Sequence, residues 1–250
     1  APGSGSRAGE ADFIALHPAI RRILDTQRAW IDAGRVIAYR TALELDTQKH
    51  HPDAARREAA ARWCSLVTPV LKSAWTEQAF SGASACLQVF GGHGYVREWG
   101  IEQHVRDARV AMIYEGTNEI QAIDLLVRKT LPDGAAALQS LLAELAAEAG
   151  QSPRTQQALI AFGDFVREQL LPQISEPGAA PDQPFWLADD FLRAVALLLM
   201  AWAWDRLATA SHADAPAQAA FWRWVWPELE MRMAMMRTTL TTGQSAPAML

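Results

Sequence analysis

The sequence predicts an all-α protein, an antiparallel bundle of helices joined by short connections. Apolar residues make up 50% of the 250 positions, which is enough to build one large domain or two smaller ones. Leu138, Leu141, Leu142 and Leu145 repeat at the spacing of one helix face, and similar stripes recur along the chain. We find no run of alternating β-branched residues between turn signals, and no repeat of fixed period.

The first half is expected to begin with two long helices. Pro18 is tolerated in a first turn and opens a helix over residues 18–49, which ends at His50–Pro52. Asp53 is a suitable N-cap for the second helix, since its side chain can accept a hydrogen bond from an unpaired backbone N–H. Pro69 is expected to kink that second helix, because it removes a backbone donor.

A glycine-rich stop follows the second helix. The glycines of Gly91–Gly94 can take the left-handed conformation that closes a helix end. Residues 95–117 show no clean helical period, so we expect short turns and loops there. Asn118 with Gln121 resembles a capping box, which predicts Asn118 as the N-cap of a helix reaching Leu131.

The second half is expected to contain only helices and turns. The stripes predict four further helices, near residues 138–145, 159–170, 187–209 and 217–242. The four prolines within 172–184 predict a loop, and Pro227 should bend or break the last helix. We divide the chain into a linker or truncation remnant with a partial helix (1–16), a helical domain (17–133) and a helical extension (134–250).

Composition excludes several functional classes. The net charge of −5, with acidic and basic residues interleaved, argues against a surface for nucleic acid or anionic membrane. The longest apolar run, 194–204, has about half of the ~20 residues that span a bilayer. Arg193 and Asp205 bracket it, so a core helix is favoured over a membrane span. Cys64 and Cys86 are expected to be buried thiols in a reducing compartment such as the cytoplasm.

Glu115 is the main candidate for chemistry. Met112, Ile113 and Tyr114 precede it, and this apolar flank is expected to desolvate the carboxyl partly, which raises its pKa and makes it a better base. The helix start near Asn118 acts in the opposite direction, because its dipole favours the anion. Such a base could remove a weakly acidic proton from carbon. The alternative is an ordinary loop glutamate near a helix start.

Other polar features have simpler explanations. Gly91–Gly94 could cradle a phosphate with backbone N–H groups, or only end a helix; it does not fit a dinucleotide-binding glycine pattern. Arg106 and Asp107 are expected to form an ion pair that fixes the loop. His93 and His104 have no companions at metal-ligand spacing, so no metal site is predicted, and the chain lacks the Glu-x-x-His pairs of a di-metal bundle.

The last third of the chain is rich in tryptophan and methionine. Tryptophan rings could stack on a ligand, but packing between the last two helices is the favoured interpretation, and the methionines form a soft core or partner surface. These residues are Trp202, Trp204, Trp222, Trp224, Trp226, Met231, Met233, Met235 and Met236.

Three motifs within residues 88–121 carry a family resemblance. In order they read QVFGGHGY, VRDARV and IYEGTNEIQ. Together they resemble the C-terminal helical domain of the acyl-CoA dehydrogenase family, and the resemblance extends less sharply over residues 17–131. Residues 135–250 resemble the helical extension of a subgroup of longer bacterial members.

The resemblance implies FAD-dependent oxidation of an acyl-CoA thioester to the trans-2-enoyl-CoA, as in fatty acid metabolism. Glu115 stands where the family's base removes the α-proton, and its backbone N–H would help bind the thioester carbonyl. The resemblance also implies a homodimer or dimer of dimers, with an electron-transfer flavoprotein as a possible acceptor. It assigns Gln88, Gly91 and Gly92 to the FAD of a neighbouring subunit, Thr117 and Glu119 to FAD, and Tyr114 and Gly116 to the substrate. Many relatives carry Gln in place of Glu119.

The sequence also departs from the family. Relatives place a helical domain, a β-domain and an arginine-bearing helix before this region, and these residues contain none of them. We therefore expect a C-terminal fragment that binds FAD weakly or not at all and is inactive alone. The alternative function is a non-catalytic helical assembly module that uses the Trp- and Met-rich end of the chain as its contact surface.

Overall fold

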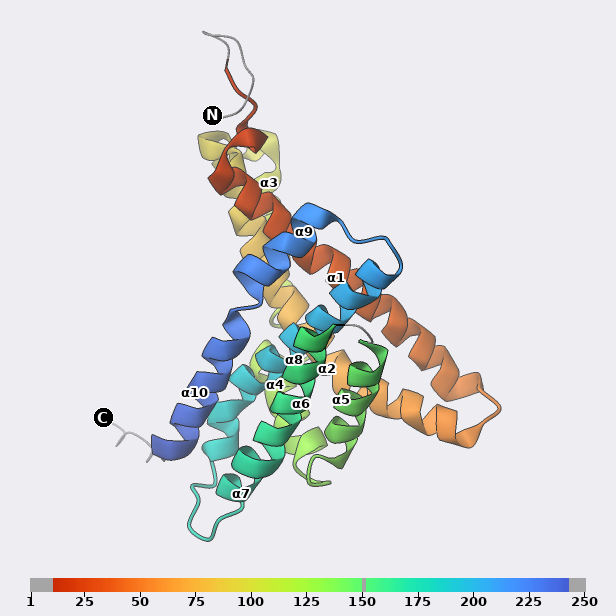
Figure 1. Cartoon of the computed structure of the whole chain (residues 1–250). Helices are drawn as coiled ribbons and strands as arrows, with labels where there is room; N and C mark the ends of the chain where they lie inside the picture. Colours follow the sequence, from red (N-terminus) through yellow and green to blue (C-terminus); the bar gives the residue numbers. More distant parts are fainter. Residues whose placement is uncertain (1–10, 150–151, 243–250) are drawn as a thin grey trace, which may run out of the picture.

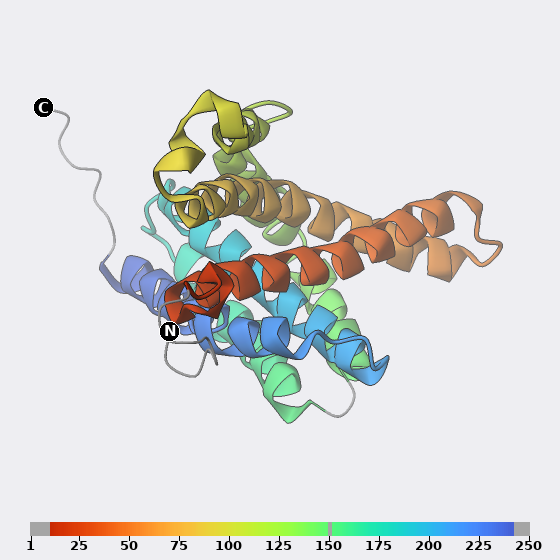
Figure 2. The same cartoon turned by 90° about the horizontal axis from the view of Figure 1, so that it is seen from above.

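The computed structural model describes residues 11–149 and 152–242, and all regular secondary structure in these residues is helical. The predicted all-α class is therefore confirmed. Two long helices, α1 (Pro18–His50) and α2 (Ala54–Val89), run antiparallel and side by side. The turn that joins them extends well beyond the remaining helices, as the view from above shows (Figures 1 and 2).

The ends of the two long helices follow the predicted signals. Pro18 occupies the first turn of α1, where a proline loses no hydrogen bond. The Asp53 side chain accepts a hydrogen bond from the backbone N–H of Ala55 at 2.9 Å, which confirms it as the N-cap of α2. α2 continues through Pro69, which is buried, so the proline does not end the helix. At the far end, Gly91 adopts φ 58° and closes α2 as expected.

The segment after α2 is more helical than predicted. Two 3₁₀ turns, η2 (Gly91–Tyr95) and η3 (Arg97–Trp99), are followed by α3 (Ile101–Ala111). The prediction of only turns and loops over 95–117 is therefore wrong. None of the residues in α3 is fully buried. Ile101, Val105 and Ala108 do repeat at the spacing of one helix face and are half-buried, a short stripe that the prediction overlooked.

The remaining elements follow in short steps. They are α4 (Asn118–Ile123), the π-helix η4 (Asp124–Thr130), α5 (Ala136–Glu148), α6 (Pro153–Phe165), η5 (Val166–Leu170), α7 (Leu171–Ile174), α8 (Gln183–Thr209), α9 (Ala215–Ala220), η6 (Phe221–Val225) and α10 (Glu228–Thr242). The proline-rich loop starts later than predicted, because Pro172 lies in the first turn of α7, where it costs no hydrogen bond. The predicted break of the last helix at Pro227 is confirmed.

The centre of the fold is α8. Every residue from Ala194 to Trp204 is buried, with an exposed fraction of 2% or less. This confirms a core helix. Among the described residues, no helix combines the length and apolarity that crossing a bilayer requires. The hydrophobic core contains side chains from both 17–133 and 134–250, and the division between those two ranges stays a prediction.

The predicted apolar faces of α5 and of α6 with η5 are confirmed. Their side chains are all buried: Leu138, Leu141, Leu142, Leu145, Leu159, Phe162, Val166 and Leu170. Cys64 is buried as expected, whereas Cys86 is only half-buried; burial raises the pKa of both thiols. Both cysteines are free, so they pack as small side chains without a disulfide.

Arg40 of α1 connects the two halves of the chain. Its guanidinium donates hydrogen bonds to Glu44 at 2.6 Å, to Glu144 at 2.9 Å and to Glu148 at 3.1 Å. It also lies 4.6 Å from the centre of the Trp63 ring, a cation–π distance. One side chain of α1 is thereby bonded to two carboxylates of α5, which ties the extension to the long helices.

The tryptophans pack mainly as predicted. Trp204 of α8 stacks on Phe221 with ring centres 6.4 Å apart, and Trp222 contacts Trp226 at 5.2 Å. Trp202 departs from the expectation, because its ring contacts Trp63 of α2 instead of the last helices. Two methionines are buried, Met233 and Met236, and two are exposed, Met231 and Met235. Trp224 is exposed at 39%.

Candidate active site

The candidate base, Glu115, has an unusual backbone conformation. It lies in the loop between α3 and α4 with φ 58°, and Gly116 follows with φ 85°. Only two other non-glycine residues in the described part of the chain, Ala135 and Ser211, have positive φ. Such conformations cost about 1–3 kcal/mol and tend to cluster at functional sites, where the surroundings enforce them. The backbone therefore marks Glu115 as one of three such positions, and it is the one that lies in the sequence motif.

The side chain of Glu115 is exposed, which corrects one prediction. Its apolar neighbours were expected to desolvate it, but Ile113 and Tyr114 are themselves 52% and 54% exposed. Apolar neighbours in sequence exclude water only when another element covers them. No described element covers this loop, so desolvation of Glu115 requires something beyond the described residues.

The start of α4 also differs from the prediction. Thr117 is the N-cap, and its Oγ1 accepts a hydrogen bond from the backbone N–H of Ile120 at 3.4 Å. Asn118, the predicted cap, is already helical. Gln121 does not close a capping box with Asn118; its Nε2 donates to the backbone carbonyl of Glu115 at 3.1 Å. Both Thr and Asn are good N-caps, so the sequence alone did not decide between them.

Asn118 instead points into the fold, toward α2. It is 6% exposed, and its Nδ2 donates to the carbonyl of Ser73 at 3.1 Å. Its Oδ1 accepts hydrogen bonds from Lys72 Nζ and Thr76 Oγ1, each at 3.0 Å. These three α2 residues had no place in the predicted site. The sequence did contain one signal for this contact. Thr117 and Asn118 are both suitable N-caps, and only one of them can cap α4, so the other side chain is free to bond a different element.

The charged groups at the start of α4 have shifted pKa values. The Thr117 side chain and the backbone N–H of Glu119 itself bond its carboxyl and hold the pKa of Glu119 below its usual value. Partial burial lowers the pKa of Lys72. Glu119 is therefore a persistent anion at neutral pH, which fits a hydrogen-bond acceptor better than a proton acceptor. Its predicted contact with FAD stays a prediction.

The predicted site residues fall into two groups. Tyr114, Glu115, Gly116, Thr117 and Glu119 are consecutive or nearly so, on one loop and one helix start. The second group, Gln88, Gly91 and Gly92, lies exposed at the end of α2. No hydrogen bond or ion pair joins the two groups within residues 11–149 and 152–242.

The two glycines of the second group face open space. A Cβ atom added to either Gly91 or Gly92 would meet no other atom within 4 Å. The described fold therefore does not by itself require glycine at position 92, and the backbone there is accessible to a molecule that approaches closely.

The prediction of an ion pair between Arg106 and Asp107 is wrong. The two are adjacent in α3, and neighbouring positions on a helix do not face each other. Asp107 instead accepts a hydrogen bond from Gln103, one turn earlier, at 2.7 Å. In the part of the chain that the structure describes, no three His, Cys, Asp or Glu side chains are grouped so as to hold a metal ion.

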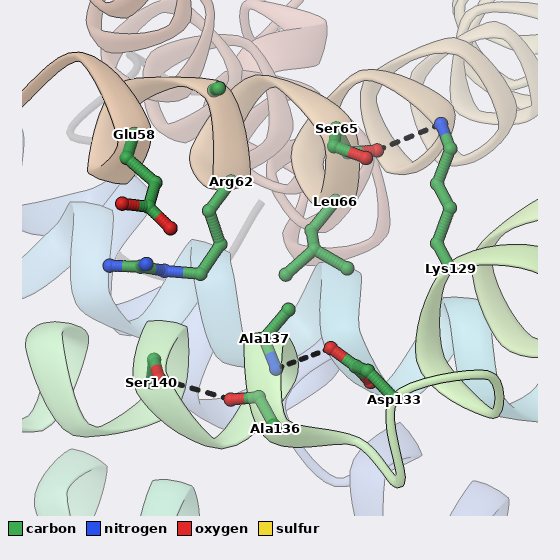
Figure 3. Close-up of a pocket in the computed structure, with 10 residues that line it drawn as sticks. Glu58, Arg62, Ser65, Leu66, Lys129, Asp133, Ala136, Ala137 and Ser140 are labelled. Atoms are coloured by element: carbon green, nitrogen blue, oxygen red, sulfur yellow. Dashed lines mark hydrogen bonds between the residues drawn. The ribbon is translucent and has the colours of Figure 1, made fainter. Parts of the chain in front are cut away.

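A groove of about 460 Å³ lies away from Glu115, between α2, η4 and α5. Figure 3 shows Glu58 and Arg62 extending into it from α2, with Lys129 at the other end. Lys129 donates to the carbonyl of Ser65 at 2.9 Å, and Asp133 accepts from the backbone N–H of Ala137 at 2.9 Å. The groove contains none of the predicted site residues.

Known proteins share this sequence over part of their length. The chain is 37% identical over 179 residues to a 3-methylmercaptopropionyl-CoA dehydrogenase of Ruegeria pomeroyi, covering 72% of the chain and 29% of that protein. It is 37% identical over 129 residues to the broad-specificity linear acyl-CoA dehydrogenase FadE5 of Mycobacterium tuberculosis, covering 50% and 21% respectively. The chain thus spans less than a third of the length of these relatives.

Solved structures share the fold. ACDH-11 of Caenorhabditis elegans, solved in complex with C11-CoA, matches 97% of the chain and 43% of that protein, with a TM-score of 0.68 and 19% identity. An acyl-CoA dehydrogenase of Bacillus anthracis, complexed with FAD, matches with a TM-score of 0.64 and 18% identity, over 97% and 44% respectively. Residues 4–129 match the family described as "Acyl-CoA dehydrogenase, C-terminal domain". The chain therefore belongs to the acyl-CoA dehydrogenase family and contains the C-terminal domain of that family.

Proposed function

We propose that Glu115 is the proton acceptor in FAD-dependent dehydrogenation of an acyl-CoA thioester to the trans-2-enoyl-CoA, carried out by a longer protein of which this chain is a part. The observation that carries the proposal is the left-handed backbone of Glu115, φ 58°, inside the family's YEGT motif. Membership of the family and the CoA-thioester names of its relatives support the same reaction.

In this reaction the carboxylate of Glu115 and its backbone N–H have separate tasks. Its carboxylate takes the proton from the α-carbon, while the β-hydrogen leaves with its electron pair and the carbon–carbon double bond forms. FAD, when bound, supplies the hydride acceptor. The backbone N–H of Glu115 donates to no acceptor among the described residues, so it is available to the thioester carbonyl, where negative charge develops.

The described residues fit one side of an FAD site. Gly91 and Gly92 leave their backbone open to close approach, and Thr117 and Glu119 present polar groups beside Glu115. The opposite side is missing, because Glu115 and its neighbours are exposed. We therefore propose that the chain alone binds FAD weakly or not at all and does not oxidise acyl-CoA by itself.

Several large apolar side chains between residues 90 and 120 are exposed and are proposed to be covered in the longer protein. They are Phe90 (43%), Tyr95 (82%), Trp99 (55%), Ile113 (52%), Tyr114 (54%) and Ile120 (44%). Covering them would exclude water from Glu115 and supply the desolvation that raises the pKa of a carboxylate base. Part of the cover is proposed to come from a second subunit whose FAD contacts Gln88, Gly91 and Gly92, in a homodimer or dimer of dimers. An electron-transfer flavoprotein is the proposed electron acceptor.

The test is Glu115→Gln in the complete gene product, with Glu98→Gln as the matched control. Glu98 is an exposed carboxylate in η3 of the same segment. We expect Glu115→Gln to abolish acyl-CoA oxidation while the flavin absorbance of the purified protein is unchanged, and Glu98→Gln to retain turnover. Wild-type turnover in Glu115→Gln would contradict the proposal.

The assembly module makes the opposite prediction. In that case Glu115→Gln would leave the biological activity unchanged. Deletion of residues 185–250 would destroy oligomerisation but would also remove the core helix α8, so the sharper variant is Trp224→Ala with Met231→Ala, which should destroy oligomerisation and keep the fold. The exposed side chains of Trp224, Met231 and Met235 would then form its contact surface.

A further inference from the structure

We propose that Asn118 is a positioning residue for Glu115: it anchors the start of α4 to the middle of α2 and so sets where the carboxylate and the backbone N–H of Glu115 point. The inference rests on the proposed function of Glu115. It assigns Asn118 no contact with substrate or cofactor.

The Asn118 amide is buried, and its nitrogen and its oxygen each have hydrogen-bond partners. Its nitrogen donates to the Ser73 carbonyl at 3.1 Å, and its oxygen accepts from Lys72 and Thr76, both at 3.0 Å. It is the single asparagine in the chain. A buried amide with all of these partners fixes both the distance and the orientation between two helices, because any rotation leaves a polar atom without a partner.

The α2 side of this anchor is rigid. Ser73 is 2% exposed, and it lies near the middle of a helix that runs from residue 54 to 89. Thr76 Oγ1 lies 2.7 Å from the Lys72 carbonyl and 3.0 Å from Asn118 Oδ1, so its single hydroxyl proton is shared between these two acceptors. The start of α4 is thus fixed to a packed part of the fold, although the loop before it is exposed.

Two hydrogen bonds carry this restraint back to Glu115. The backbone N–H of Asn118 donates to the Met112 carbonyl at 3.2 Å, which closes the loop at its base. Gln121, one turn into α4, donates to the Glu115 carbonyl at 3.1 Å. A left-handed glutamate persists only where its surroundings enforce it. The enforcement here comes through α4, and α4 is held by Asn118.

The test compares Asn118→Ala with Gln183→Ala in the complete gene product. Gln183 is the matched control, because it is equally buried, at 6%, and its amide donates to the Leu240 carbonyl at 3.3 Å far from the site. We expect Asn118→Ala to lower kcat by about 100-fold with FAD content and KM little changed, since a displacement of about 1 Å can cost this much. Gln183→Ala should keep the wild-type kcat.

A second readout does not depend on activity. In the 250-residue chain, we expect Asn118→Ala to speed amide hydrogen exchange at Ile120 and Gln121, whose N–H groups donate to Thr117, by at least tenfold, with exchange in α8 unchanged. Gln183→Ala should leave these two amides unaffected. If Asn118→Ala fails to fold, Thr76→Val removes one bond to the amide and should give a smaller loss of the same kind.

Equal kcat values in Asn118→Ala and Gln183→Ala, with unchanged exchange at Ile120 and Gln121, would overturn the positioning role. That result is distinct from failure of the proposed function, which would appear as activity in Glu115→Gln. Asn118→Asp sharpens the comparison, because it keeps the acceptor for Lys72 and Thr76 but cannot donate to Ser73; we expect partial recovery of kcat relative to Asn118→Ala.

Discussion

The segment that contains Glu115 and the helix α8 differ in how they use apolar side chains. In α8, Ala194–Trp204 is buried throughout, whereas α3, just before Glu115, has no buried residue. Tyr95 is 82% exposed in the same segment. α8 therefore completes a core that it shares with α1, α2 and α4, whereas the segment before Glu115 presents apolar side chains outward. Exposed apolar side chains alone therefore do not give Glu115 a dry environment, and the proposed function assigns that task to a covering surface.

The largest expected effect tests burial directly. Leu198→Ala in α8 should lower the free energy of unfolding by about 2–5 kcal/mol, because it removes a fully buried side chain and leaves a cavity. Ile113→Ala, beside Glu115, should change it by less than about 0.5 kcal/mol, because that side chain is half exposed. Urea titrations of both variants measure the difference. Similar losses would show that the segment is covered in the chain itself.

A second prediction concerns the link between the two regions. Arg40→Ala should cost about 3 kcal/mol, the lower end for removing one partner of a buried ion pair, because Glu144 and Glu148 lose their partner. Arg35→Ala, on the same helix and 69% exposed, is the control and should cost less than about 1 kcal/mol. Thermal unfolding of the three proteins compares them. A loss confined to α5 and α6 would show that the extension unfolds separately.

The smallest effect concerns backbone strain. Glu115→Gly should raise the free energy of unfolding by about 1 kcal/mol, because glycine takes positive φ without steric cost. Ser211→Gly, at φ 57° between α8 and α9, is the matched variant and should stabilise by a similar amount. Chemical denaturation measures both. Destabilisation by Glu115→Gly would mean that the carboxylate itself makes stabilising contacts.

The long helices could be predicted from the sequence because their signals are local. Pro18 and Asp53 mark helix starts, and the glycines from Gly91 onward mark an end, whatever surrounds them. α3 was harder to predict, because its apolar stripe is short: only Ile101, Val105 and Ala108 repeat at helical spacing between polar residues.

The site was less predictable, because its properties depend on distant parts of the chain. Thr117 caps α4 because the Asn118 side chain is hydrogen-bonded to Ser73 of α2 and is not available as a cap. The exposure of Glu115 likewise depends on which element covers the loop, and its sequence neighbours do not determine that. The motif identified the residue, but its environment required the fold.

The position of the Asn118 anchor along α2 has a consequence for an assembled enzyme. Ser73 and Val89, the last residue of α2 before Gly91 and Gly92, lie on one continuous helix, about 24 Å apart at 1.5 Å per residue. Under the proposed function and assembly, α2 therefore fixes the position of Glu115 in its own subunit and also carries the surface offered to a neighbour's flavin. An axial shift of α2 would disturb two reaction centres at once, which gives a mechanical route for communication between subunits.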